Sequence, residues 1–185
     1  MTSSAINASA DQQPDREWVI GGPVDAVAMR HAMGAFPSGV TVLTTRLGER
    51  SVGMTISSFA SVSIHPPLLL QCVARSAGSL PAFRMGSSVA VNILARDQAD
   101  LARRFASKSE NRFEGIEFDT DGNGCPVLAG AAASVSGCID RIYDAGDHVI
   151  LLIRACEVRR DDTLPLLYYS GRMHDWVDMV SALAS

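Results

Sequence analysis

The segment GVTVLTTRLGERSVGMTISSFASVSIHPPLLLQCVA, residues 39–74, decides the fold of this 185-residue chain. Its first part is rich in β-branched residues, reaches the turn GER, and continues as SVGMTISSF, a pattern that predicts a β-hairpin. The run PPLLLQCVA is short and continuously apolar, which predicts a buried strand. Strands therefore follow one another here without long crossover helices.

The middle of the segment carries more hydroxyl groups than a strand needs for packing: Thr55, Ser57, Ser58, Ser61 and Ser63. One interpretation is that they form the solvent face of an edge strand. The other is that they line a ligand with many acceptors, because hydroxyls and free backbone N–H groups suit phosphate or a heteroaromatic edge. A glycine within the strand would let a flat ligand approach closely. Residue chemistry alone leaves these two interpretations balanced.

The rest of the chain predicts many strands and few helices. We expect strands at about 88–94, 131–144, 147–159 and 165–170, and helices at 24–34, at 79–86, at 97–106 with Asp97 as the cap, and at the C-terminal end from 174. Because strands do not alternate with long helices, a doubly wound parallel sheet is disfavoured. The expected fold class is mainly β with inserted helices, in the form of an antiparallel barrel.

Composition places the chain among globular proteins, with 47% hydrophobic and 19% charged residues. A net charge of −4 and scattered basic residues argue against nucleic acid as a partner. The polar residues 1–20 predict a disordered tail, and 21–185 a single domain. We expect no signal peptide, no membrane span and a cytoplasmic location. The four cysteines lack CxxC spacing, and those at 72, 138 and 156 are expected to be small buried hydrophobes.

Several standard catalytic motifs are missing from the sequence. It contains no GxGxxG after a strand, no GxxxxGK[ST] and no GxSxG, which removes the common dinucleotide, P-loop and nucleophile-elbow signatures. It also lacks HExxH, and its four histidines are far apart, so no metal site is expected.

An ordered set of seven motifs nevertheless resembles a known family, the short-chain flavin reductases. These motifs are MRHAMGAFPSGVTVLTTR, GMTISSFASVSIHPPLLLQC, VAVNIL, DQADLARRFA, RFEGIEF, DAGDHVILLIRACEV and PLLYYSGRM, spread over about residues 27–173. The family consists of NAD(P)H:flavin oxidoreductases that supply reduced flavin to two-component monooxygenases. The resemblance implies a split β-barrel of Greek-key type, a homodimer, and a flavin groove near the dimer interface.

The resemblance also implies which residues hold the flavin, FAD or FMN. Along the isoalloxazine ring it places Val52, Gly53, Met54 and Thr55, and at the ribityl or phosphate portion Ser57 and Ser58. Another wall with phosphate contacts would be formed by Cys72, Val73, Ala74, Arg75 and Ser79. At the RF position, Arg112 would approach the phosphate and Phe113 would cover the ligand.

For the nicotinamide side, the resemblance points to the GDH motif. His148 is the expected catalytic and NAD-binding residue, with Gly146 beside it, and Asp147 would orient it. Arg172, after YYSG, is a further candidate for the dinucleotide. The chain departs from the family in having Ser57 where Asn is frequent and His65 where Asp is frequent. The first departure makes one flavin contact shorter or water-mediated.

The expected reaction is hydride transfer from NADH to FAD or FMN, with the reduced flavin passed to a partner monooxygenase. NADH is favoured over NADPH because no basic cluster for a 2′-phosphate is visible. Two other functions stay open at this point. One is a flavin-binding oxidase of the pyridoxamine-phosphate-oxidase type, and the other is a non-catalytic flavin- or haem-binding module.

Overall fold

The computed structural model describes residues 24–174, and its centre is a seven-stranded antiparallel sheet. The strand order is β3–β2–β6–β9–β10–β5–β4. The strands span β2 Thr41–Leu47, β3 Arg50–Ile56, β4 Phe59–Ser63, β5 Leu68–Ala74, β6 Ser88–Ile93, β9 Ala133–Ala145 and β10 His148–Arg160. The predicted hairpin is β2–β3, in which Thr41 lies opposite Ile56, and the predicted buried strand is β5.

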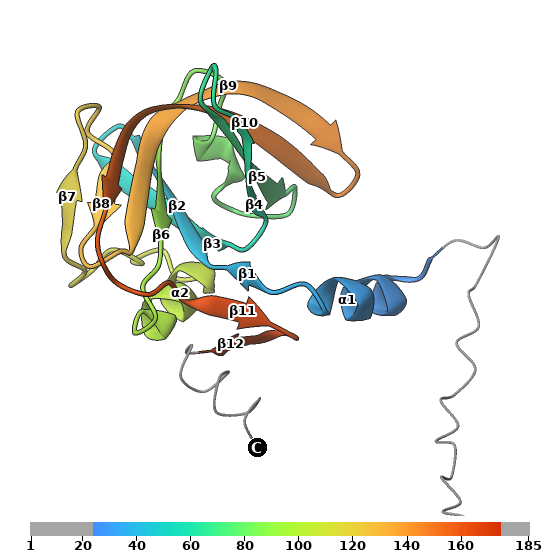
Figure 1. Cartoon of the computed structure of the whole chain (residues 1–185). Helices are drawn as coiled ribbons and strands as arrows, with labels where there is room; N and C mark the ends of the chain where they lie inside the picture. Colours follow the sequence, from blue (N-terminus) through green and yellow to red (C-terminus); the bar gives the residue numbers. More distant parts are fainter. Residues whose placement is uncertain (1–23, 175–185) are drawn as a thin grey trace, which may run out of the picture.

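The sheet curls into a barrel but does not close within the described residues, because its two edges are β3 and β4 (Figure 1). This confirms the expected split barrel. Buried side chains connect the strands on the two sides of the split. Gln71 of β5 donates from Nε2 to Thr41 Oγ1 at 2.9 Å, and Thr41 Oγ1 donates to the carbonyl of Ile56 at 2.7 Å. This chain of hydrogen bonds links β5 to β2 and β3 across the barrel, although the edge strands β3 and β4 are not paired.

The long strands β9 and β10 form a curved hairpin that arches over the barrel and ends in a projecting tip (Figure 1). The pairing register shifts between Ala155 and Glu157, next to Gly137. A Cβ on Gly137 would lie 2.1 Å from the carbonyl oxygen of Arg154, so only glycine fits where the two strands approach at this bulge.

Two apolar cores flank the sheet. The barrel interior is filled by residues such as Leu43, Val73 and Leu151, and the second core lies between the sheet and α2, Ala99–Ala106. Within α2, Ala102 and Phe105 are buried. The predicted cap was wrong: the N-cap is Gln98, which makes no side-chain cap bond, and its Oε1 instead accepts from the N–H of Ala95.

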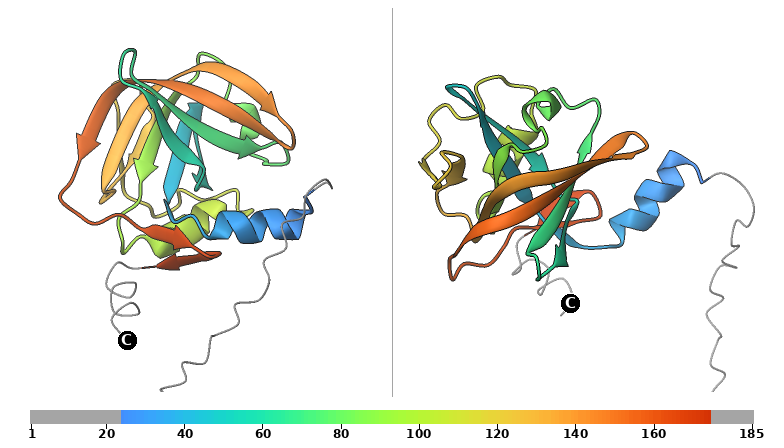
Figure 2. Two further views of the ribbon diagram at one scale, coloured as in Figure 1. Left: turned by 45° about the vertical axis from the view of Figure 1, so that its right-hand side comes forward. Right: turned by 90° about the horizontal axis from the view of Figure 1, so that it is seen from above.

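The helix α1, Ala26–Gly34, forms where the sequence predicted it, with Asp25 Oδ1 accepting from Val27 and Ala28. Yet no residue of α1 is buried, and in Figures 1 and 2 the helix stands away from the barrel. Its C-terminal end meets a small sheet of β1 Ser38–Gly39, β11 Leu167–Tyr169 and β12 Arg172–His174. The N–H of Ser170, in the β11–β12 turn, donates to the carbonyl of Gly34.

Two smaller features differ from the sequence predictions. The expected helix at 79–86 is only a 3₁₀ turn, η1 Leu80–Ala82. The loop after α2 contains the strand β7 Phe118–Thr120, which pairs with β8 Pro126–Leu128. The predicted tail 1–20 and most of the C-terminal helix lie outside the described residues. Among the helices of 24–174, none is long and apolar enough to cross a membrane.

Candidate functional site

A groove runs along β3, between the segment that follows β5 and the segment that follows α2. It has two adjoining parts, which share Gly78, Ser79, Lys108 and Arg112. The inner groove has a volume of about 440 Å³ and is lined by Met54, Thr55, Ser76–Ser79, Phe105–Lys108 and Arg112. The outer groove has a volume of about 270 Å³ and is lined by Leu47, Arg50–Gly53, Gly78, Ser79, Pro81, Ala82, Lys108–Glu110, Arg112 and Phe113.

Arg112 lies where the two parts of the groove meet. Its Nη1 donates to the carbonyl of Gly53 and to Ser79 Oγ, both at 2.8 Å, and its Nη2 donates to the carbonyl of Ser107 at 2.5 Å. Its Nε is buried without a hydrogen-bond partner within the described residues, and no described carboxylate forms an ion pair with it. A guanidinium held by neutral groups keeps its full charge available to an anion in the groove.

Two aromatic rings pack against β3 at Gly53, whose carbonyl accepts from Arg112. Phe113 packs edge-on against Phe105, with ring centroids 4.9 Å apart. Gly53 is buried against both rings, because a Cβ there would lie 2.7 Å from Phe105 Cε1 and 3.2 Å from Phe113 Cζ. The missing side chain therefore makes room for the aromatic pair, and Gly53 also lines the outer groove, where its flavin contact stays a prediction.

The other predicted residues of β3 divide between its two faces. Val52 and Met54 pack against the barrel core, and Met54 also lines the inner groove. The hydroxyl of Thr55 donates to the carbonyl of Ala102 in α2 at 2.6 Å, so it fixes the helix to the strand. Seven of the predicted flavin residues thus share the two-part groove: Val52, Gly53, Met54, Thr55, Ser79, Arg112 and Phe113.

Ser57 and Ser58 lie in a different hollow from Arg112. This second hollow is mostly apolar and is lined by α1, the start of β4 and the β11–β12 turn: Arg30, Met33, Gly34, Phe36, Ser38, Ser57–Ala60, Leu70, Tyr168, Ser170 and Gly171. Ser58 Oγ donates to the carbonyl of Cys72 at 3.0 Å and accepts from its N–H at 3.2 Å. The described residues that line this hollow include one cation, Arg30, which makes a phosphate role for the serine pair less favourable here than at Arg112.

The predicted wall at the end of β5 is only partly available to a ligand. Val73 is fully buried in the barrel core, whereas Cys72 and Ala74 are half-buried. Arg75 faces the β9–β10 hairpin, where its Nε donates to the carbonyl of Gly146 at 3.0 Å and its guanidinium pairs with Asp144. Arg75 therefore stabilises the tip of the β9–β10 hairpin and does not line the groove around Arg112.

The tip of this hairpin presents His148 opposite Ala74 of β5. Asp147 Oδ1 lies 2.7 Å from His148 Nδ1, and this contact lowers the pKa of the Asp147 carboxyl below its ordinary value. The carboxylate therefore orients the ring, and the His148 side chain is 43% exposed. Arg172 is exposed on β12, beside the turn that lines the second hollow.

Sequence reasoning missed Lys108, which lines both parts of the groove and makes no ion pair within the described residues. It also missed the Ser76–Gly78 turn that forms the opposite wall. A signal was present in SKSENRF, where a lysine and an arginine follow the amphipathic helix at close spacing. Two cations at one groove point to an anionic ligand.

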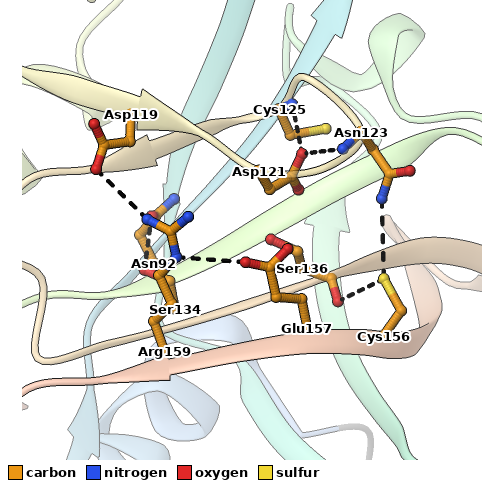
Figure 3. Close-up of polar contacts among 10 residues, drawn as sticks. All are labelled: Asn92, Asp119, Asp121, Asn123, Cys125, Ser134, Ser136, Cys156, Glu157 and Arg159. Atoms are coloured by element: carbon orange, nitrogen blue, oxygen red, sulfur yellow. Dashed lines mark hydrogen bonds and ion pairs between the residues drawn. The ribbon is translucent and has the colours of Figure 1, made fainter.

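A second polar cluster (Figure 3) lies around β7 and β8, on the opposite side of the barrel from α1 (Figure 1), and does not resemble a catalytic site. Asp121 Oδ1 accepts from the N–H groups of Asn123 and Cys125, which closes a turn, and Arg159 bridges Asp119 and Glu157. Within residues 24–174, no group of histidine, cysteine and acidic side chains could hold a metal ion. The cluster is best explained as support for the β7–β8 loop.

All four cysteines are free, but their burial differs from the prediction. Cys125 is the buried one, Cys72 and Cys138 are half-buried, and Cys156 is exposed. Cys156 was predicted to be buried because its run is apolar. The outer end of β10 faces solvent on this side, so the prediction was wrong.

Thiol reactivity should follow this order of burial. Burial raises the pKa of the Cys125 thiol from 9.0 to about 11, so it stays protonated and unreactive at pH 8. We expect a thiol-specific reagent to modify Cys156 first. The Cys156→Ser variant should therefore lack the fast phase of thiol modification. Because the folded-state pKa is raised, the neutral thiol should stabilise the fold below pH 9 and lose that contribution as the pH rises towards 11. Fast modification of Cys125 in the native protein would contradict this assignment.

The chain is similar to known proteins over most of its length. Residues 33–177 match the flavin reductase like domain. The chain is 42% identical over 150 residues to actinorhodin polyketide dimerase of Streptomyces coelicolor, covering 80% of this chain and 85% of that protein. It is 34% identical to the FMN reductase (NADH) SmoA of Agrobacterium fabrum, covering 88% and 92%. The NADH:FAD oxidoreductase SgcE6 of Streptomyces globisporus, solved with NAD and FAD fragments, superposes with a TM-score of 0.76 at 36% identity, covering 82% and 93%.

Proposed function

We propose a function for this chain, which belongs to the flavin reductase-like family. It is an oxidoreductase that uses NAD(P)H to reduce flavin. The more specific proposals concern which residues act, which nucleotide is used, and what assembles with the chain. The observation that carries them is Arg112, whose charge is held without a carboxylate partner in the described chain at the junction of the groove.

We assign the flavin phosphate to Arg112 and Lys108, and the ribityl chain to the inner groove beside Met54 and Thr55. Two cations suit a phosphate, and the buried Nε of Arg112 is a donor that still lacks a partner within the described residues. The ring would then extend past Met54 towards Ser57 and Ser58. From the sequence, Ser57 and Ser58 were expected at the ribityl or phosphate portion. In this pose they would instead contact the polar edge of the ring.

The protein has little acid–base chemistry to perform in this reaction. Bound flavin supplies the ring that accepts the hydride. The chain must hold the nicotinamide over that ring at reacting distance and exclude water. His148 lies at an exposed hairpin tip that Arg75, through Asp144 and Gly146, keeps in place. We assign His148 to positioning the nicotinamide.

Replacing His148 by alanine tests this assignment. We expect the KM for NADH to rise about fivefold, the usual effect of losing one hydrogen bond, while the KM for flavin changes less than twofold. His65→Ala is the matched control, because His65 lies in an exposed turn at the opposite end of β5 from His148. A larger effect of His148→Ala on flavin than on NADH would place His148 at the flavin instead.

The nucleotide and the protein partner are proposed from the relatives. SmoA is named an NADH-dependent FMN reductase, and the HsaB protein of Rhodococcus jostii, 33% identical, is the reductase subunit of a flavin-dependent monooxygenase. We propose NADH as the donor and a monooxygenase component as the recipient of reduced flavin. Because the groove is open to solvent along β3, an edge strand, reduced flavin can leave without a large rearrangement.

The exposed helix α1 supports a homodimer. The helix has nine residues and none of them is buried. Two large apolar side chains face solvent here: Val27 is 74% exposed, and Phe36, just beyond the helix, is 75% exposed. A helix of this length is marginal in water on its own, so another surface must cover its apolar side. We propose that a second copy of the chain covers it, against the apolar second hollow that Met33 and Phe36 border.

Mass measurement in solution distinguishes this arrangement from its alternatives. We expect a dimer for the natural protein and a monomer for Val27→Glu. Val158→Glu is the control, because Val158 is 68% exposed on β10, on a different part of the surface. A monomeric natural protein would mean that another segment of the chain or another protein covers α1.

The reductase function itself is tested by NADH consumption. Purified protein should oxidise NADH only when FAD or FMN is added, and reduced flavin should appear in solution. NADH loss that depends on a small organic substrate instead of added flavin would indicate an oxidase. Flavin binding without NADH loss would indicate a binding module and would contradict the proposal.

A further inference from the structure

We propose that the outer groove binds the adenylate half of FAD, so that this chain prefers FAD to FMN. The inference rests on the proposed function, because it assumes that the flavin phosphate lies at Arg112. It adds a specificity site whose residues lie on the β2–β3 turn and on the segment after α2. No residue of this site takes part in the hydride transfer.

The groove continues beyond the place where FMN would end. Arg112, Lys108, Ser79 and Gly78 line both parts, so the outer groove begins where the phosphate would lie. It then passes along Arg50 and Ser51 at the start of β3 and reaches a further shallow hollow beside Asn111 and Glu114. FMN would leave this region, about 270 Å³ in volume, to solvent.

The outer groove has the charge that a second phosphate requires. Arg50 forms no ion pair with a carboxylate among residues 24–174, and its Nη2 makes only a long contact, 3.4 Å, with the carbonyl of Glu110. Arg50, Lys108 and Arg112 therefore line the outer groove against one acidic side chain, Glu110. A diphosphate that crosses this region would be neutralised along its length.

The remaining lining suits a nucleoside. Leu47, which is 51% exposed, and Pro81, which is exposed, offer apolar surface on which a purine base can lie. The Glu110 carboxylate is an acceptor of the kind that binds ribose hydroxyls. The same carboxylate would repel the 2′-phosphate of NADPH, a group that the adenylate of FAD lacks.

An adenosine diphosphate group could come from FAD or from NADH. Continuity of the groove favours FAD, because the outer part joins the inner part at the phosphate end. The proposed nicotinamide position at His148 lies at the hairpin tip, beside β5, whereas the outer groove begins at the β2–β3 turn. The adenylate of FAD reaches the outer groove directly through Arg112.

Binding measurements test the inference without relying on turnover. Flavin fluorescence titration should give a Kd for FAD at least tenfold lower than that for FMN. Arg50→Gln should raise the FAD Kd about five- to tenfold and change the FMN Kd by less than twofold. Arg46→Gln is the matched control, because Arg46 lies on the same hairpin but lines neither part of the groove, and its Nη2 donates to the carbonyl of Glu49.

The outcomes separate this inference from the proposed function. Equal affinity for FAD and FMN, with no effect of Arg50→Gln, would overturn the specificity site but leave flavin binding intact. Weaker binding of NADH instead of FAD in Arg50→Gln would assign the outer groove to the pyridine nucleotide and also overturn the inference. Failure of both flavins to bind the natural protein would contradict the proposed function itself.

Discussion

Replacing Arg112 by alanine should raise the Kd and the KM for flavin about 10- to 100-fold, with a much smaller change in kcat at saturating flavin. Hydrogen bonds from a charged donor contribute about 1.5–3 kcal/mol, and each 1.4 kcal/mol is a factor of ten in affinity. The phosphate lies far from the reacting ring in the proposed pose, so the loss should be uniform for ground state and transition state. Fluorescence titration and steady-state kinetics with varied flavin measure both quantities.

Two further variants make this result interpretable. Arg103→Ala removes a guanidinium from the neighbouring helix α2 that pairs only with the exposed Asp100 within the described chain, so it should leave flavin binding unchanged. Arg112→Lys keeps the charge, but a lysine cannot reach Gly53, Ser79 and Ser107 together. Its Kd for flavin should lie between those of Arg103→Ala and Arg112→Ala. A loss of kcat at unchanged flavin KM would remove Arg112 from the phosphate role.

Gly137→Ala should destabilise the fold by about 3 kcal/mol or more, the largest effect we expect from a single methyl group. The added Cβ would lie 2.1 Å from the Arg154 carbonyl oxygen and 3.1 Å from Ala155 Cα, and a backbone contact cannot relax by a rotamer change. The two longest strands of the barrel would have to separate at the bulge. For a chain of this size, thermal unfolding should show Tm lowered by at least about 6 °C.

Gly39→Ala provides the comparison for this variant. A Cβ on Gly39 meets no atom within 4 Å, so its substitution should change Tm by little. Chemical denaturation should show the same ranking of the two variants. If Gly137→Ala were as stable as Gly39→Ala, the close approach of β9 and β10 would be wrong.

Local sequence patterns predicted most strands, because β-branched and apolar runs are properties of a strand's own residues. The β-branched run before Gly48 and the apolar run before Arg75 gave β2 and β5 correctly. The short strand β7 was missed, since Phe118–Thr120 is exposed and owes its conformation to pairing with β8. Cys156 was misjudged for a related reason: burial at the end of a long strand depends on what packs there.

The candidate site was predictable as a set of segments but less so as a set of contacts. The motifs correctly brought β3, Ser79 and Arg112 together in one groove. The motifs could not show that Thr55 hydrogen-bonds to α2 or that Arg75 faces the β9–β10 hairpin. Both contacts depend on residues that are far apart in the sequence. Nor could the motifs show that Gly53 leaves room for Phe105, because only the fold brings that ring against the strand.

We propose that this chain passes hydride from NADH to a flavin held at Arg112. Anaerobic mixing of the protein with NADH and FAD tests it most directly, by following the visible absorption of oxidised flavin. We predict rapid bleaching with the natural protein and with Arg103→Ala, and, at low flavin, a rate at least tenfold lower with Arg112→Ala. Bleaching no faster than in the absence of protein, or equally fast with Arg112→Ala at low flavin, would contradict the account.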